Sequence, residues 1–297
     1  MQYFNLDASL RASRFCFGCE PLGGADWGDD VDVNKIESAI ELALEQGINF
    51  FDTADVYGLG MSEARISAIL GHRRHEQVIA TKGGVSWKEG ENGRAITRID
   101  CSPKYIRSAV EDSLRRLKLD RIPVYYIHWP EKNKDIGLVA ETLYELQTDG
   151  KIGAIGCSNF SVEQLQRALE FAPIRLVQIP VNILLERPTP EMVGICQQNE
   201  MGIIGYNVLA SGLLTGKFNA QTTFPLNDRR SRLASFVGEG LLRSLERVED
   251  LRKDAKVTGY SLAQHSIKNA LEQPAVEATI VGIKGVKQLE ENIRAYI

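Results

Sequence analysis

The chain has 297 residues, of which 43% are hydrophobic, and its 35 basic residues nearly balance its 39 acidic ones. This composition excludes a disordered tail, and the lack of a basic stripe in the sequence argues against a nucleic-acid-binding protein. Five cysteines, an odd number spread along the chain, indicate reduced thiols in a cytoplasm rather than a disulfide framework. Because the sequence has no basic start and no long apolar stretch, we expect neither a signal peptide nor a membrane span.

Short apolar runs that read as buried strands alternate with runs of helical spacing. The eight runs are 14–17, 48–51, 77–80, 124–127, 152–155, 175–178, 202–206 and 278–281. Alternating strands and helices predict a parallel sheet. Eight such units in this length favour a closed (β/α)₈ barrel, which we expect to form a single domain over residues 1–297.

Local signals mark helix starts and two segments outside the barrel. Pro103 after Ser102 is typical of a helix start, and Ser161-x-x-Gln164 is typical of a capping box. Residues 3–12 are compatible with a small hairpin outside the barrel. Residues 207–239, which follow the seventh strand, form the longest stretch without regular spacing, and a loop of that length in a compact domain is usually functional or mobile.

Four polar residues stand where consecutive strands end. Asp52 closes the second strand and is followed by Tyr57, while Lys82 closes the third strand and His128 the fourth. The carboxyl ends of barrel strands converge on one face, where active sites lie. Taken singly, Asp52 or Lys82 is more often a structural charge, and Tyr57 a rim aromatic. Together, the four residues indicate catalysis.

The chemistry of this set follows from its residue types. An ammonium beside a phenol stabilises the phenolate and lowers its pKa from about 10. A carboxylate keeps that ammonium charged and oriented, and a neutral imidazole can steer a carbonyl oxygen. We therefore expect Lys82 and Asp52 to tune Tyr57 as a proton donor that faces a carbonyl, with His128 beside it.

Several common motifs are missing from the sequence. No G-x-G-x-x-G follows a strand, the segment 212–218 is one residue short of a phosphate-binding loop, and H-E-x-x-H is absent. Cys16 and Cys19 have C-x-x-C spacing without a second pair, so we interpret them as packed cysteines and predict no metal site.

Longer motifs identify a family resemblance. The segments that carry it are 49–58 (NFFDTADVYG), 80–83 (ATKG), 128–130 (HWP), 150–160 (GKIGAIGCSNF), 212–217 (GLLTGK) and 288–292 (QLEEN). They resemble the aldo-keto reductases, in the family's order, from about Arg14 to Tyr296. The resemblance implies a (β/α)₈ barrel that binds NAD(P)H in an extended form and passes hydride from nicotinamide C4 to a carbonyl carbon. It implies Tyr57 as general acid/base, Lys82 and Asp52 as its tuners, and His128 as the residue that orients the carbonyl. Some relatives that reduce C=C bonds have Glu at this position, so His128 favours C=O reduction.

The resemblance also implies the cofactor residues. Ser158, Asn159 and Gln178 match the positions that hold the nicotinamide carboxamide, and Tyr206 matches the aromatic that stacks on the ring. The pyrophosphate loop corresponds to Asn207, Leu209, Gly212, Leu213 and Lys217. The adenosine end corresponds to Gly282, Lys284, Gln288, Glu291 and Asn292. Lys284 at a 2′-phosphate would favour NADPH, with NADH possible. This chain has Gly282-Ile283 where many relatives have Lys-Ser or Lys-Thr, and Asn207-Val208 where many have Ser-Pro.

Loops after the strands would line the substrate pocket with Glu20, Trp27, Trp87 and Trp129. Glu20 favours a polyol, sugar or amine-bearing substrate over an apolar aldehyde. Besides a reductase of aldehydes, ketones or sugars, two alternatives stay open. One is a nucleotide-binding auxiliary subunit with little turnover, and the other is an aldolase that forms a Schiff base on Lys82.

Overall fold

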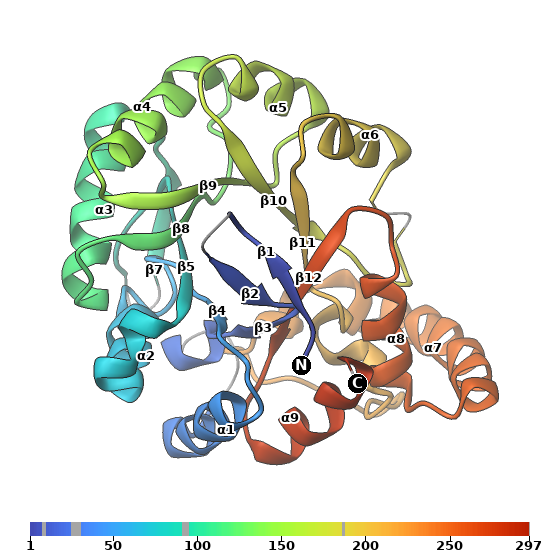
Figure 1. Ribbon diagram of the computed structural model, residues 1–297. Coiled ribbons are helices and arrows are strands. Elements are labelled where there is room, and N and C mark those ends of the chain that lie inside the picture. The colour runs from blue at the N-terminus through green and yellow to red at the C-terminus, as the bar shows by residue number, and fades with distance from the viewer. Residues whose placement is uncertain (8–9, 25–30, 91–94, 186–187, 297) are drawn as a thin grey trace.

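The computed structural model describes residues 1–7, 10–24, 31–90, 95–185 and 188–296. Among these residues, eight parallel strands close into a barrel in chain order, with the last strand paired to the first (Figure 1). The barrel strands are β3 (Phe15–Gly18), β4 (Phe50–Asp52), β5 (Val78–Gly83), β8 (Ile122–Ile127), β9 (Ile152–Ser158), β10 (Ile174–Pro180), β11 (Gly202–Tyr206) and β12 (Val276–Gly282). All eight predicted strands are therefore confirmed, and so is the predicted (β/α)₈ barrel.

The helices that follow the strands form a ring around the barrel (Figure 1). They are α1 (Val33–Glu45), α2 (Met61–Leu70), α3 (Pro103–Leu117), α4 (Ile136–Thr148), α5 (Val162–Leu169), α6 (Pro190–Gln198), α7 (Gly238–Thr258), α8 (Leu262–Leu271) and α9 (Val286–Ile293). Within the described ranges, none of these helices is long and apolar enough to cross a membrane.

Alternation along each strand divides the apolar side chains into two cores, because successive strand residues point to opposite faces. Phe51, Ile79 and Tyr125 point outward and pack under the helices. Their neighbours Phe50 and Ala80 point inward and fill the barrel.

The predicted helix starts are confirmed by their caps. The Ser102 hydroxyl accepts a hydrogen bond from the Tyr105 amide at the start of α3. Ser161 and Gln164 form the expected capping box at the start of α5. Ser261 and Gln264 form a second one at α8, from the same S-x-x-Q pattern.

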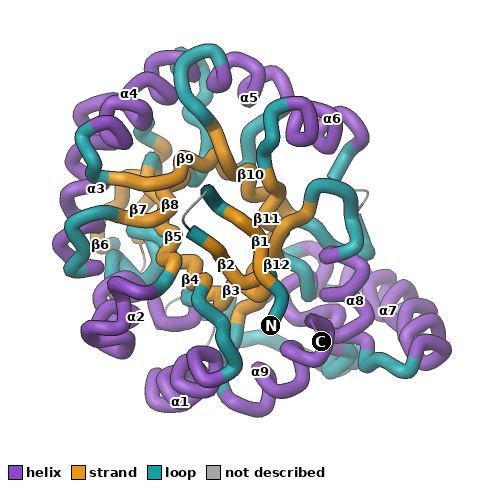
Figure 2. Tube along the Cα trace, in the orientation of Figure 1, coloured by secondary structure: helices purple, strands orange, loops and turns teal. Residues whose placement is uncertain are grey.

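Two hairpins lie outside the barrel wall. The predicted N-terminal one pairs β1 (Tyr3–Asn5) with β2 (Arg11–Ser13) and lies across the barrel's centre in Figure 2. It plugs the barrel, since Phe4 is buried against Phe50, with ring centroids 6.1 Å apart. The second hairpin, β6 (Val85–Glu89) with β7 (Ala95–Ile99), was not predicted, because its partly exposed residues carry no long apolar run.

The segment between β11 and α7 (residues 207–237), which we call the strap, is more ordered than its sequence suggests. It contains the 3₁₀ turns η4 (Ala210–Thr215), η5 (Arg229–Arg232) and η6 (Ala234–Phe236). Phe218, Phe224 and Phe236 contact one another edge-to-face with ring centroids 5.3–5.7 Å apart. The guanidinium of Arg230 lies over two of these rings and pairs with Asp228. The strap therefore has a small core of its own.

Candidate active site

Strand alternation places the predicted site residues at one mouth of the barrel. Asp52 lies two residues beyond the inward-facing Phe50, and Lys82 lies two residues beyond the inward-facing Ala80. The same spacing relates His128 to Tyr126 on β8. Because side chains alternate along a strand, each site residue continues the inward face of its strand beyond the apolar filling.

A buried ion pair forms the base of the site. The Lys82 ammonium donates to Asp52 Oδ1 at 2.6 Å and to the Thr53 carbonyl at 2.8 Å. The Gln178 amide donates to the other carboxylate oxygen of Asp52 at 2.8 Å. Asp52 and Lys82 are 3% and 0% exposed, so these hydrogen bonds offset much of the cost of removing both charges from water.

Tyr57 and His128 lie beside this pair and are partly accessible. Their rings meet edge-to-face with centroids 5.8 Å apart, and the Lys82 ammonium is 5.1 Å from the Tyr57 ring centroid. The turn that carries Tyr57 is held tightly against the segment after β3. A Cβ on Gly58, which has φ +59°, would lie 2.2 Å from the carbonyl oxygen of Gly23, so only glycine allows this approach.

The protonation states differ in part from the sequence expectation. Desolvation raises the pKa of Tyr57 well above its usual value, and Glu20 and Asp52 raise it further. The net shift of the Tyr57 pKa is therefore upward, and the expected lowering is wrong for this structure, because desolvation dominates. The Lys82 ammonium donates its hydrogen bonds to Asp52 and to the Thr53 carbonyl. Desolvation, with a contribution from Lys82, lowers the pKa of His128 well below its usual value, which leaves a neutral imidazole as expected.

Polar side chains suited to a planar amide continue around the same mouth. The Tyr206 hydroxyl donates to Asn159 Oδ1 at 2.8 Å, and the Asn159 amide donates to Ser158 Oγ and to the His128 carbonyl, both at 3.0 Å. Together with Gln178, these side chains offer hydroxyl and amide donors and acceptors next to Tyr57 and His128. This donor set fits a nicotinamide carboxamide beside Tyr57, the predicted proton donor.

Residues predicted for the rest of the nucleotide lie in the strap and after β12. The Asn207 side chain accepts from the Ser211 amide at 2.7 Å, Leu213 is buried in the strap core, and Lys217 lies over the Phe218 ring. Leu209 is partly buried and packs against the same core, and Gly212 has φ +93°.

Beyond β12, Gly282 is exposed, and the Gln288 side chain accepts from the Lys284 amide at 2.8 Å. Against the effect of desolvation, hydrogen bonds and the charge of Arg230, with a smaller contribution from Lys284, lower the pKa of Asp228, so Lys284 lies within electrostatic reach of the strap. Glu291 accepts from the Ser261 hydroxyl at 2.9 Å, and Asn292 is 5% exposed. The residues predicted for the nucleotide thus form two groups, one in the strap and one after β12.

The predicted substrate residues occupy different settings. Glu20, in the 3₁₀ turn η1 (Glu20–Gly23), pairs with Arg229 of the strap at 2.8 Å. Trp87 lies on β6, opposite Thr97 of β7, rather than in a loop as expected. Trp129 is 44% exposed, and Trp27 lies outside the described residues. Arg229 could not be assigned to the pocket from sequence, because 209 residues separate it from Glu20.

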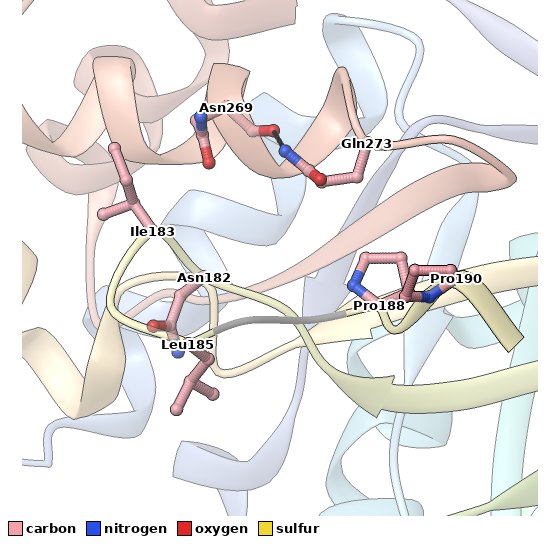
Figure 3. Close-up of a pocket in the computed structure, with 7 residues that line it drawn as sticks. All are labelled: Asn182, Ile183, Leu185, Pro188, Pro190, Asn269 and Gln273. Carbon is pink, nitrogen blue, oxygen red and sulfur yellow. Dashed lines mark hydrogen bonds between the residues drawn. The ribbon is translucent and has the colours of Figure 1, made fainter. Parts of the chain in front are cut away.

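A separate hollow lies away from these residues. It has a volume of about 400 Å³ and lies between the segment after β10 and the end of α8 (Figure 3). Its lining residues are Asn182, Ile183, Leu185, Pro188, Pro190, Asn269 and Gln273. Because the predicted site residues are not among them, we place the active site at the barrel mouth and not in this hollow.

The cysteines are buried, free thiols. Burial raises the pKa values of Cys16 and Cys19 well above their usual range, which suits packed rather than reactive thiols. Across the described part of the chain, no three His, Cys, Asp or Glu side chains group as a metal site would require.

Comparisons with known proteins agree with this geometry. Residues 15–297 match the Aldo/keto reductase family. The chain is 35% identical to "Aldo-keto reductase YhdN" of Bacillus subtilis over 98% of its own length and 87% of the relative's. It is 28% identical to the "NADH-specific methylglyoxal reductase" of Escherichia coli over 96% of its length and 90% of the relative's.

A solved structure supports the same assignment. The glycerol dehydrogenase AKR11B4 from Gluconobacter oxydans superposes with a TM-score of 0.85 at 33% identity, covering 95% of this chain and 86% of that one. Family match, relatives and barrel agree over nearly the whole length. The chain therefore belongs to the aldo/keto reductase family and is an NAD(P)H-dependent oxidoreductase.

Proposed function

We propose that this enzyme interconverts a small carbonyl compound and its alcohol at the Tyr57–His128 mouth of the barrel. The observation that carries the proposal is the adjacency of the two rings, 5.8 Å apart, above the buried Lys82–Asp52 pair. A nicotinamide held by Ser158, Asn159, Gln178 and Tyr206 would supply a hydride for the carbonyl carbon.

The chain's own residues supply the proton and the orientation. Tyr57 is a phenol with an ordinary pKa of about 10, and the raised pKa extends its protonated range further into alkaline pH, so its hydroxyl can donate to the carbonyl oxygen as the alcohol forms. His128 is neutral and can donate an N–H to the same oxygen. Lys82, fixed by Asp52, places a positive charge beside Tyr57 that favours the phenolate left behind.

We further propose NADPH as the preferred nucleotide. Ser158, Asn159 and Gln178 would hold the carboxamide, Tyr206 would stack on the nicotinamide, and Lys284 would meet a 2′-phosphate. The lysine lies close enough to the strap to influence Asp228. One relative is named as NADH-specific and another, from Schizosaccharomyces pombe, is named with NADP(+), so the preference has to be measured.

The setting of Lys82 disfavours the aldolase alternative. A Schiff base requires a neutral, accessible amine. The Lys82 nitrogen instead donates to Asp52 and to the Thr53 carbonyl, and the residue is 0% exposed.

The experiment pairs nucleotide binding with turnover. NADPH and NADH are titrated by fluorescence into the wild-type protein and Tyr57→Phe, and both proteins are assayed on a generic aldehyde. We expect tighter binding of NADPH, equal binding by both proteins, and a loss of turnover of about 10²–10⁴-fold in the variant, because the general acid is gone. Binding without turnover in the wild type would favour the auxiliary-subunit alternative. Absence of binding by either nucleotide would overturn the proposal.

For the substrate, we propose a small hydroxylated carbonyl. Glu20 and Arg229 place a carboxylate and a guanidinium near Tyr57, where both affect its pKa. Such groups recognise hydroxyls better than alkyl chains. Two relatives are named for glycerol and methylglyoxal, which are small polar molecules.

Replacing Glu20 tests this substrate class. We expect Glu20→Gln to lower kcat/KM for glyceraldehyde about tenfold, since a charged hydrogen-bond partner is worth roughly 1.5–3 kcal/mol. Activity on hexanal should stay nearly constant. The assay compares the ratio of the two kcat/KM values with that of the wild type, and an unchanged ratio would contradict the substrate proposal.

A further inference from the structure

A buried polar cluster lies on the outer side of the barrel wall, behind the site. Glu63, in the first turn of α2, is 0% exposed. One of its carboxylate oxygens accepts from the Thr81 hydroxyl at 2.6 Å, and the other accepts from Arg116 Nε of α3 at 2.6 Å. A buried carboxylate is costly unless it is fully paired, and replacing such a pair by apolar residues is often stabilising. The cluster is therefore better explained by a role in positioning neighbouring segments than by a contribution to the stability of the fold.

The cluster contacts the strand that carries Lys82. Thr81 immediately precedes Lys82 on β5, and alternation sends the two side chains to opposite faces of the barrel wall. Lys82 points inward to Asp52, while Thr81 points outward to Glu63. A bond at Thr81 thus fixes the backbone from which Lys82 projects.

The cluster also contacts the turn that carries Tyr57. Helix α2 begins four residues after Tyr57, and the Ser62 amide donates to the Tyr57 carbonyl at 3.2 Å. The Ser62 hydroxyl accepts from Thr53 at 2.8 Å and donates to the Cys19 carbonyl at 2.7 Å. Glu63, the next residue, therefore anchors the end of this turn to β5.

Asp55, inside the same turn, completes the arrangement. It is 2% exposed, its amide donates to the Lys82 carbonyl at 3.2 Å, and within the described residues its Oδ1 atom has no hydrogen-bond partner. Burial raises its pKa well above the usual value. Glu63 raises it further, while Arg116, the Val56 amide and Lys82 lower it. Two tyrosines, Tyr105 and Tyr125, lie within its electrostatic influence.

We propose that Glu63, Thr81 and Arg116 are positioning residues, which lock the Tyr57 turn to the Lys82 strand so that phenol and ammonium keep their separation. Asp55 acts with them as a neutral acid, since a second buried carboxylate beside Glu63 would exceed the single charge of Arg116. The inference rests on the proposed function of Tyr57 as proton donor. A misplacement of about 1 Å can cost about 10²-fold in rate, even when the change lies outside the site.

The experiment compares four substitutions with a matched control. Thr81→Val removes the hydrogen bond between Thr81 and Glu63, and Glu63→Gln removes the charge that accepts it. Thr81→Ser keeps the hydroxyl, and Asp55→Asn mimics the neutral acid. Ser67→Ala is the control. Ser67 lies on the same helix α2 and donates a buried hydrogen bond to the Leu117 carbonyl at 2.6 Å. It lies outside the Tyr57 turn and β5.

We expect Thr81→Val and Glu63→Gln to lower kcat by about 10- to 100-fold while KM for the carbonyl changes little, because binding groups stay in place. Thr81→Ser, Asp55→Asn and Ser67→Ala should keep kcat within about twofold of the wild type. If Glu63→Gln fails to fold, the proposal is tested by comparing kcat of Thr81→Val, which lacks the hydroxyl, with that of Thr81→Ser, which keeps it.

A spectroscopic signal of Tyr57 supplies a readout independent of turnover. Tyrosine is labelled with carbon-13 at Cζ, and the Tyr57 resonance is identified by its loss in Tyr57→Phe. We expect Thr81→Val to shift this resonance in the nucleotide-free protein and Ser67→Ala to leave it unchanged. If Thr81→Val matches Ser67→Ala in both kcat and resonance, the positioning role is overturned. A wild type without turnover would refute the proposed function instead, while the resonance would still test the lock.

Discussion

At the scale of single residues, the candidate site combines a buried ion pair with two partly accessible rings. Lys82 and Asp52 are buried and bonded to each other, whereas Tyr57 and His128 are partly accessible and face the mouth. The buried pair is fixed, and the accessible pair can meet a substrate. The raised pKa of Tyr57 and the lowered pKa of His128 both favour the neutral forms.

The raised pKa of Tyr57 predicts different pH dependences for the two directions of the reaction. Reduction needs the protonated phenol, which a raised pKa preserves into the alkaline range. We therefore expect kcat/KM for carbonyl reduction to stay level from about pH 7 to about pH 10, the usual tyrosine pKa. Oxidation needs the phenolate, so its kcat/KM should rise with pH over the same range. Steady-state profiles in both directions check this, and a fall in reduction between neutral pH and about pH 9 would contradict it.

The residue scale also shows what sequence can and cannot predict. Asp52, Lys82 and His128 could be placed because each ends a strand, and barrel topology brings strand ends together. The Glu20–Arg229 pair could not be placed, because nothing local links residues 209 positions apart. The direction of the Tyr57 pKa shift was missed for a related reason, since desolvation depends on all the surrounding atoms.

At the scale of elements, the strap is the main departure from expectation. Its sequence lacks a regular period, yet Phe218, Phe224 and Phe236 pack together and Arg230 lies over two of the rings. A core built from residues spaced irregularly along the chain gives no periodic signal, so the prediction of a loop missed it. The capped helices and the barrel strands were predictable because their signals are local.

The strap core leads to a prediction about nucleotide binding. Phe236 is 4% exposed, and Phe236→Ala should remove the centre of the core, at a cost of up to about 3–5 kcal/mol to the strap. We expect nucleotide affinity to fall about tenfold or more, because the strap carries the predicted pyrophosphate residues and lies within electrostatic reach of Lys284. Fluorescence titration of NADPH measures the loss. Val257→Ala on α7, where Val257 is 88% exposed, is the control and should bind as the wild type does. Equal affinity in both variants would show that the strap core is not needed for binding.

At the scale of the whole molecule, the candidate active site and the hairpin that covers the barrel lie at opposite ends of the strands. The tetrad of Asp52, Tyr57, Lys82 and His128 lies at the carboxyl ends of the strands, while the β1–β2 hairpin plugs the barrel with Phe4 against Phe50. Residues 1–297 stay predicted as one domain, in which one mouth is polar and the other is packed. Substitutions at the packed end should therefore change the stability of the protein without altering the reaction at the polar end.

Phe4→Ala tests the separation directly. Phe4 is 6% exposed, so its truncation should lower the free energy of unfolding by about 3–5 kcal/mol, the usual cost of a buried Phe. We expect kcat to stay within about twofold of the wild type, because the tetrad does not touch Phe4. Urea unfolding and steady-state assays at low temperature supply the two measurements. A fall in kcat that matches the fall in stability would contradict the separation.

The plugged end has a practical consequence, because both ends of the described chain lie there (Figure 1). The Tyr3 hydroxyl donates to the Gly47 carbonyl just before β4, and the Tyr296 ring packs on Phe15 at the start of β3, with centroids 4.9 Å apart. A tether at either terminus would therefore hold the molecule by its closed base. Immobilised on a bead or an electrode in this way, the enzyme would present its open mouth to the bulk solution, with diffusion of substrate and nucleotide unobstructed.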